Sequence, residues 1–328
     1  MDPVAKTLFA PFEPLHGVGV FANARMHPGL AHSMVLHQGF RPYARELQSE
    51  GFSMISELPA SGEFSHGFVL LPKNVDEARY DVARVLKILN KAGVIAIAGA
   101  NDAGGKRAKR ILADFGVEDI QEHAANHARV AWGVKRGENE AVEKALIEGA
   151  PSMVAATGFI SQPGLFAWDK IDKGSEILAA HLPNDLRGTG ADFGCGYGFL
   201  SRYVLQACEN IRSFSCVDAD YRAVQACRKN MEGVQAPVRY FWEDLAKESP
   251  ARDLDFIVMN PPFHEGKTTD ADIGKRFIET ARNSLRHGGQ LWMVANVNLP
   301  YEEDARALFS SCQKITEKNG FKIFRAVR

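Results

Sequence analysis

The residues with the clearest chemical potential lie in the stretch DFIVMNPPFHEG, residues 255–266, where an apolar run ends at Asn260. The Asn260 side-chain oxygen and the Pro261 carbonyl can each accept an N–H bond from an amine, which turns the nitrogen lone pair toward an electrophile. Pro261 and Pro262 fix the backbone, and Phe263 offers a flat face for a planar ring. A plain strand-terminating turn would explain the prolines alone. We therefore predict that Asn260, Pro261, Pro262 and Phe263 act on an amine conjugated to a ring or amide.

A second motif, ADFGCGYGFLS at residues 191–201, has the composition of a nucleotide-binding loop. Gly194, Gly196 and Gly198, with Cys195 between them, let the backbone turn tightly and approach a ligand beside a helix start. Glycines also mark ordinary turns. The next apolar run ends at Asp218 and Ala219, where a carboxylate is placed to bind ribose hydroxyls.

Dinucleotides and S-adenosylmethionine both use such a loop and acid, so other acids must discriminate between them. Asp192, just before the loop, suits the methionine ammonium of S-adenosylmethionine. Asp244, in VRYFWEDL, could accept from the adenine amino group, with Trp242 or Phe241 against the ring. Asp244 could instead cap a helix, and Glu243 could be the actual acceptor. The sequence therefore favours S-adenosylmethionine as cofactor.

The elements that must position these motifs alternate between strand and helix from residue 190 to residue 297. This alternation predicts a doubly wound, mainly parallel α/β sheet. The end of the chain, QKITEKNGFKIFRAVR, predicts two strands joined by an Asn319-Gly320 turn. An antiparallel hairpin that closes a parallel sheet is expected of class I methyltransferases.

The first half of the chain repeats the order of the elements expected in the second half, as a degenerate copy would. Residues 67–101 and 255–296 both run strand, proline stop, amphipathic helix, glycine turn and strand, although any two α/β units share some of this rhythm. Matching the two segments places Leu71 on Met259, Pro72 on Asn260 and Gly93 on Gly289. The first copy then lacks the Asn. With a Gly, Pro and Ser-rich linker near residues 149–164, we predict a degenerate scaffold or RNA-binding domain at 1–150 and a catalytic domain at 151–328.

These motifs, DFGCGYG, VDAD and NPPFHEG, together with GGQLWMVANVNLPYE, resemble the class I ribosomal RNA guanine-N2 methyltransferases, the RsmC-like proteins. The resemblance spans the chain and implies two tandem Rossmann-like methyltransferase domains, of which the first has lost cofactor binding. It also implies that Phe166, Asp172 and Gly174 line the methionine end of the pocket. Asp172 could equally cap the helix that follows it.

The resemblance implies methyl transfer to the N2 amine of a guanine in 16S ribosomal RNA of the small subunit. NPPF leans toward guanine, yet a large-subunit 23S guanine or a protein glutamine stays possible, as does an inactive cofactor-binding or assembly protein. His264 could take up the released proton, but a protonated product amine loses its proton to water without a dedicated base.

Composition limits the partners and the compartment. A net charge of −1 gives no global nucleic-acid signature, so RNA contact would rest on local groups. Lys106, Arg107, Lys109 and Arg110 form one basic run, and Lys267, Lys275 and Arg276 lie just past the catalytic step. Either set could be an ordinary solvated face.

Five cysteines without a CxxC pair predict neither disulfides nor a metal site. With no membrane span or signal peptide expected, we predict a cytoplasmic protein.

Overall fold

The computed structural model describes residues 2–12, 19–262 and 268–328, so the predictions for Phe263, His264 and Lys267 lie outside the described residues. The chain divides into two compact units. One comprises residues up to Pro151 with Gln162–Gly164, and the other comprises Ser152–Ser161 with Leu165–Arg328.

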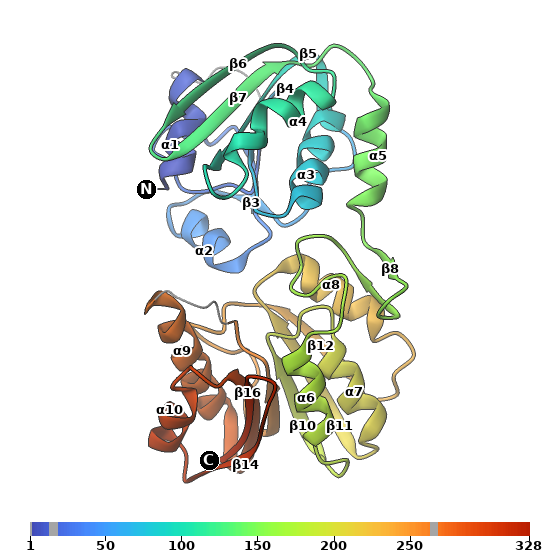
Figure 1. The fold of residues 1–328 in the computed structure, drawn as a ribbon, viewed down its shortest axis with the longest axis vertical. Helices are drawn as coiled ribbons and strands as arrows, with labels where there is room; N and C mark the ends of the chain where they lie inside the picture. The colour runs from blue at the N-terminus through green and yellow to red at the C-terminus, as the bar shows by residue number, and fades with distance from the viewer. Residues whose placement is uncertain (1, 13–18, 263–267) are drawn as a thin grey trace. The chain divides into compact units, whose positions relative to one another are not determined.

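The amino-terminal unit is a seven-stranded sheet in the order β3-β2-β1-β4-β5-β7-β6, with helices α1 to α5 around it (Figure 1). Pairing is parallel from β3 to β5 and antiparallel at β7 and β6. Its elements are α1 (Pro3–Phe9), η1 (Ala10–Phe12), β1 (Gly19–Ala22), β2 (Val35–His37), α2 (Arg41–Ser49), β3 (Met54–Ile55), β4 (Phe64–Leu70), α3 (Val75–Ile88), β5 (Leu89–Ala100), η2 (Gly105–Arg107), α4 (Ala108–Asp114), β6 (Glu118–Ala125), β7 (Ala128–Val134) and α5 (Glu140–Glu148).

The carboxyl-terminal unit repeats this plan with the strand order β12-β11-β10-β13-β14-β16-β15. A small hairpin, β8 with β9, precedes the sheet. Its elements are β8 (Ser152–Val154), β9 (Phe159–Ser161), α6 (Lys173–His181), β10 (Gly188–Phe193), α7 (Phe199–Ala207), β11 (Ile211–Asp218), α8 (Tyr221–Asn230), β12 (Val238–Trp242), β13 (Leu254–Met259), α9 (Thr268–Ser284), β14 (Leu285–Asn296), α10 (Tyr301–Leu308), β15 (Ser311–Lys318) and β16 (Phe321–Val327).

The prediction of two related Rossmann-like domains is confirmed by this shared order. The two long strands β5 and β14 even have the same sequence of buried and exposed positions along their whole length. A strand that is packed on both faces is buried in a nearly continuous run, and both units have retained such a run in the second half of this strand. The predicted closing hairpin is also present, with Asn319 and Gly320 at φ 53° and 80°, as a tight two-residue turn requires.

The strand register corrects the match made from the sequence between the two halves. Val69 pairs with Ile97, four residues after Gly93, and Met259 pairs with Met293, four residues after Gly289. Leu70, rather than Pro72, therefore stands at the position of Asn260, and Leu-Leu-Pro-Lys replaces Asn-Pro-Pro-Phe. The match made from the sequence was displaced by two residues because a sequence does not reveal hydrogen-bond register, and Pro72 corresponds to Pro262. The conclusion that the first unit lacks the Asn is unchanged.

The predicted linker contains structure of its own. Ser152–Ser161 forms the β8–β9 hairpin around a turn at Gly158, whose φ is 71°.

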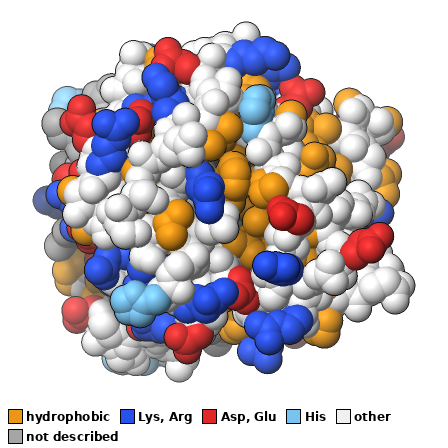
Figure 2. Space-filling view, turned by 90° about the horizontal axis from the view of Figure 1, so that it is seen from below, with side chains coloured by type: hydrophobic (Ala, Val, Ile, Leu, Met, Phe, Trp, Pro, Cys, Tyr) orange, Lys and Arg blue, Asp and Glu red, His pale blue; other side chains and the backbone are white. Residues whose placement is uncertain are grey.

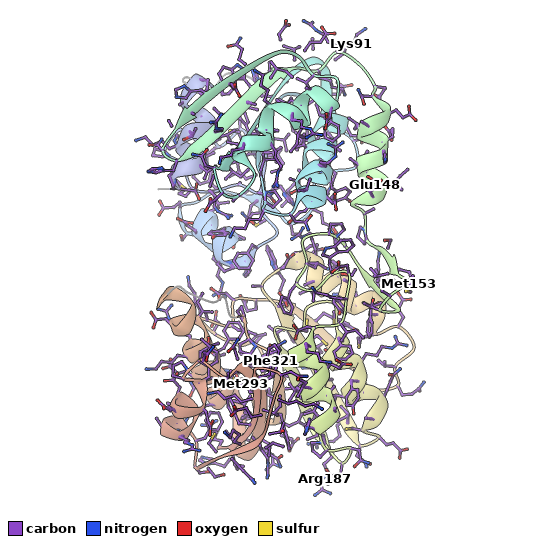
Figure 3. All side chains as sticks on the ribbon, in the orientation of Figure 1. Lys91, Glu148, Met153, Arg187, Met293 and Phe321 are labelled. Carbon is purple, nitrogen blue, oxygen red and sulfur yellow. The ribbon has the colours of Figure 1, made fainter. Side chains whose placement is uncertain are left out.

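In the carboxyl-terminal sheet, Met293 and Phe321 mark the adjoining strands β14 and β16 (Figure 3). None of the helices within the described ranges is long and apolar enough to cross a membrane.

Candidate active site

The glycine loop follows β10 directly and leads into α7. Gly194, Gly196 and Gly198 all have positive φ, at 79°, 53° and 96°, a backbone conformation that favours glycine. A Cβ on Gly196 would meet no atom within 4 Å, whereas one on Gly198 would lie 2.8 Å from the Cys227 Sγ. Gly196 therefore leaves open space beside the loop, and Gly198 lets α7 pack closely on α8.

Asp218 at the end of β11 holds the loop in place. Its Oδ2 accepts from the Gly196 N–H at 2.8 Å and its Oδ1 accepts from the Asp220 N–H at 2.9 Å. Desolvation raises the pKa of Asp218 to about 6 although these backbone donors lower it. The carboxylate thus lies next to the loop, at the place predicted for a ribose-binding acid.

Asp192 is fully buried beneath the loop. Its Oδ2 accepts from the Ser201 hydroxyl at 2.6 Å, and its Oδ1 has no hydrogen-bond partner among the described residues. Burial raises the pKa of Asp192 to about 7. The carboxylate fastens the first turn of α7 to β10, and contact with a cofactor ammonium remains a prediction.

Asn260, immediately after β13, has its side-chain amide fixed from one side. Its Nδ2 donates to the Asp172 Oδ2 at 2.9 Å and to the Ser175 Oγ at 2.8 Å. Its Oδ1 is buried without a hydrogen-bond partner in the part of the chain that the structure describes. An unsatisfied buried acceptor costs about 1–3 kcal/mol, so this oxygen calls for a donor from a substrate.

Asp172 caps a helix and also borders the cavity, and its contact with the methionine end of a cofactor stays a prediction. It caps α6 by accepting from the Ser175 N–H at 2.8 Å, and it also lines the cavity beside Asn260. Gly174 does not line this cavity. A Cβ on Gly174 would lie 3.0 Å from the Phe321 ring, so close packing of α6 on β16 accounts for this glycine.

The segment before α6 is tied to the glycine loop. The buried Asn230 side chain accepts from the Ile160 N–H and donates to the carbonyls of Ile160 and Tyr197. The Tyr197 hydroxyl donates to the Lys170 carbonyl at 3.0 Å, and burial raises the pKa of Tyr197 to about 12. Phe159 packs against the Tyr197 ring. These contacts hold residues 159–172, the covering segment, against the glycine loop.

The cavity enclosed by these elements has a volume of about 370 Å³, including space open to solvent. It brings together residues from the covering segment, the start of α6, the glycine loop, α7 and the end of β13. They are Phe166, Asp172, Ser175, Gly194, Cys195, Gly196, Tyr197, Phe199, Leu200 and Asn260. Phe166 is 61% exposed, so its ring lies at the mouth.

The remaining predicted contacts lie further along the same sheet edge. Asp244 is buried and its Oδ1 accepts from the Ala246 N–H in a turn, since residues 245–247 form a turn and not the helix that Asp244 was expected to cap. The Ala219 carbonyl accepts from the Trp242 Nε1 at 2.8 Å, and the Trp242 ring packs edge-on against Tyr221. Their contact with adenine stays a prediction.

The basic run of the amino-terminal unit is partly engaged. Arg107 donates to the Lys73 carbonyl, and Lys109 lies 3.5 Å from Glu122. Lys106 and Arg110 are exposed and have no ion pair among the described residues.

On one face of the molecule, basic and acidic side chains are interspersed around a hydrophobic strip (Figure 2), in keeping with the net charge of −1.

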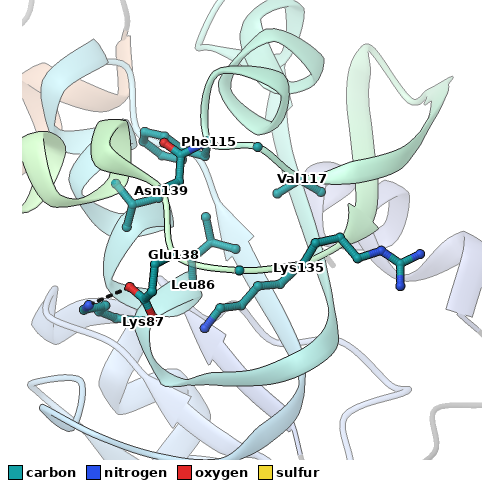
Figure 4. Close-up of a pocket in the computed structure, with 11 residues that line it drawn as sticks. Leu86, Lys87, Phe115, Val117, Lys135, Glu138 and Asn139 are labelled. Carbon is teal, nitrogen blue, oxygen red and sulfur yellow. Dashed lines mark hydrogen bonds and ion pairs between the residues drawn. The ribbon is translucent and has the colours of Figure 1, made fainter.

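A second hollow, of about 300 Å³, lies in the amino-terminal unit between α3, the end of α4 and the start of α5 (Figure 4). Its lysines are bonded to groups of their own unit. Lys87 bonds to Glu138 and Glu143, and the Lys135 ammonium donates to the Leu89 carbonyl. These contacts indicate a structural role.

Ser175, Tyr197, Phe199, Leu200 and Asn230 were not anticipated from the sequence. The contact between Ser175 and Asn260 spans 85 residues, and that between Asn230 and Ile160 spans 70. Tyr197 and Phe199 flank the third glycine, which is the one local signal that pointed to them.

Comparison with known proteins identifies the family of this chain. Residues 156–325 match the methyltransferase small domain, and residues 31–144 match the methyltransferase small domain N-terminal. A ribosomal RNA small subunit methyltransferase C from Salmonella arizonae is 30% identical over 78% of this chain and 73% of the relative. The chain belongs to this methyltransferase family. The Shewanella pealeana relative of the same name is 27% identical over 94% of this chain and 90% of its own.

A solved structure shares the two-domain fold of this methyltransferase. It is the T. thermophilus 16S rRNA N2 G1207 methyltransferase RsmC in complex with AdoMet and guanosine. The TM-score is 0.81 at 22% identity, covering 100% of this chain and 92% of that chain. The likeness confirms the predicted fold class along the whole chain.

Proposed function

We propose that this methyltransferase transfers a methyl group from S-adenosylmethionine to the exocyclic N2 amine of a guanine in 16S ribosomal RNA. The observation that carries the proposal is the buried Oδ1 of Asn260, which has no hydrogen-bond partner among the residues that the structure describes and lies at a cavity formed with the glycine loop. The names of the relatives, ribosomal RNA small subunit methyltransferase C, support ribosomal RNA as the substrate class.

The cavity residues fit the cofactor. Gly196 leaves room that a Cβ would occupy, and the Asp218 carboxylate is held beside it for ribose hydroxyls. Asp172 and Phe166 would face the methionine end, as expected from the resemblance. When bound, the cofactor supplies an electrophilic sulfonium methyl group.

The work of the protein is to align the amine. The guanine N2 lone pair is delocalised into the ring, so the nitrogen is a poor nucleophile unless its N–H bonds are fixed. The Asn260 Oδ1 accepts one N–H bond and the Pro261 carbonyl accepts the other. Both acceptors are preorganised, because Asp172 and Ser175 fix the amide and proline fixes the backbone. Phe263 would stack on the guanine, and water removes the released proton.

The amino-terminal unit supplies a scaffold and a contact for RNA. Lys106 and Arg110 are exposed and have no ion pair within the described ranges, so they are suited to phosphate oxygens, and Lys109 would add a third charge. Arg107 is better suited to bracing its loop, because it donates to the Lys73 carbonyl. The target base must leave its stack to reach the cavity, which favours unpaired RNA in the small subunit or in an assembly intermediate.

The test is methylation of small ribosomal subunits isolated from cells that lack this chain. Subunits are incubated with purified protein and methyl-labelled S-adenosylmethionine, and the 16S RNA is digested to nucleosides for mass spectrometry. N2-methylguanosine is expected as the one labelled nucleoside. Label in another nucleoside, or in a ribosomal protein only, would contradict the proposed substrate.

A further inference from the structure

The start of α6 holds the catalytic amide from its nitrogen side. Asp172 Oδ2 accepts from both the Ser175 N–H and the Asn260 Nδ2, and the Ser175 Oγ accepts from the same Nδ2. The two contacts span 88 and 85 residues of sequence, so the fold, rather than local chain geometry, brings these groups together.

The chemistry of Asp172 settles which way the amide points. The oxygen and nitrogen of an Asn side chain are nearly interchangeable in shape, but an ionised carboxylate only accepts hydrogen bonds. The Asn260 nitrogen must therefore face Asp172. The oxygen faces away from that carboxylate, where it has no partner among the described residues.

We propose that Asp172 and Ser175 are positioning residues that lock the Asn260 amide with its oxygen toward the substrate amine. This inference rests on the proposed function. The reversed amide would present N–H donors to an amine that itself needs acceptors, and the nucleophile would lose its alignment. The lock therefore selects substrates that carry an N–H donor at the reacting atom.

The amino-terminal unit shows that capping alone does not account for this arrangement. Asp2 caps α1 by accepting from the Val4 and Ala5 N–H groups, yet the position of Asn260 is occupied there by Leu70. Helix α1 packs on β5 and β7 as α6 packs on β14 and β16. Both units retain the cap, and the amide contact belongs to the unit that has the glycine loop.

The first test is Asp172→Asn, which keeps a good helix cap but removes the acceptor-only carboxylate. The single-turnover methyl-transfer rate is expected to fall about 10- to 100-fold. Ser175→Ala should lose about fivefold, and Ser175→Thr should retain most of the rate because it keeps the hydroxyl. Asp2→Asn is the matched cap variant and should change the rate less than about twofold. Equal losses in Asp172→Asn and Asp2→Asn would overturn the proposal.

The second test is a double-mutant cycle with Asn260→Ala. If Asp172 acts through the amide, Asp172→Asn adds no further loss in the Asn260→Ala background. A full additive loss would show that Asp172 acts elsewhere, for example on the cofactor.

A readout independent of activity is hydrogen exchange of the Asn260 side-chain amide, assigned by its absence in Asn260→Ala. The amide protons should exchange slowly in the wild type and faster in Asp172→Asn. Unchanged exchange would contradict the lock. Failure of the proposed function is distinguishable, because it appears in the wild type as a missing N2-methylguanosine.

Discussion

The edges of the two sheets differ at three equivalent positions, although the strand order of the sheets is the same. From the register of β1 with β4 and of β10 with β13, Phe21 stands where the other unit has Asp192, and Asn23 stands in place of Gly194. Leu70 takes the place of Asn260. The amino-terminal unit therefore has Phe, Asn and Leu where the other unit has Asp, Gly and Asn. These side chains fill the edge of its sheet.

Asn23 shows how the edge closes. It keeps the left-handed backbone of the glycine loop, with φ 57° against 79° for Gly194. Its side-chain amide donates to the Leu70 carbonyl at 3.0 Å and to the buried Asp81 at 2.8 Å, so it bridges the ends of β1 and β4. In the other unit, the glycine leaves this space to the cavity. Fold and chemistry are therefore separable, since the core pattern tolerates replacements that remove the site.

The largest effect is expected from giving the carboxyl-terminal unit the residue that the amino-terminal unit has at the position of Asn260. Asn260→Leu removes the amine acceptor, and the turnover number should fall about 100- to 1000-fold. Affinity for S-adenosylmethionine, measured by calorimetry, should change less than about threefold. A comparable loss of affinity would mean that Asn260 belongs mainly to the cofactor site.

A smaller effect is expected from Gly194→Asn, which copies Asn23 into the glycine loop. Asparagine tolerates the left-handed backbone, so the unit should fold, but the amide would occupy cavity space. The dissociation constant for S-adenosylmethionine should rise about tenfold or more. Asn23→Gly serves as control and should leave cofactor affinity as it is. Unaltered binding by Gly194→Asn would show that the loop does not face the cofactor.

Asp192 should make the stability of the protein depend on pH. Its pKa is raised from the ordinary value of 3.8 to about 7, so the unfolded chain ionises first as pH rises. The free energy of unfolding should therefore fall between about pH 4 and pH 7, by on the order of 1 kcal/mol or more through this group. Asp192→Asn, compared by urea titration, should remove that part of the slope. An identical slope in both proteins would place the ionisation elsewhere.

The smallest effect concerns RNA contact by the amino-terminal unit. Lys106→Glu with Arg110→Glu should weaken binding to 16S RNA about two- to tenfold and flatten its salt dependence, because phosphate contacts are lost. Lys91→Glu, an exposed substitution elsewhere in that unit, is the control, and filter binding at several salt concentrations is the measurement. Equal behaviour of the two variants would leave the basic run without a role in binding.

The sequence indicated the parts of the site that depend on local chain chemistry. Three motifs can be recognised from a few neighbouring residues each: a glycine loop after a strand, an acid at the end of the next strand, and Asn before two prolines. Contacts between distant segments were not accessible in this way. Ser175 gains its role only because α6 packs where it reaches Asn260, and Leu70 is identified as the counterpart of Asn260 only by hydrogen-bond register.

The most direct measurement is the number of S-adenosylmethionine molecules bound per chain, determined by calorimetric titration of the wild type and of Asp218→Ala. The difference between the two sheet edges predicts one bound molecule per wild-type chain and affinity reduced about 10- to 100-fold in the variant. Two bound molecules, or one that binds Asp218→Ala as tightly as the wild type, would contradict a single cofactor site in the carboxyl-terminal unit.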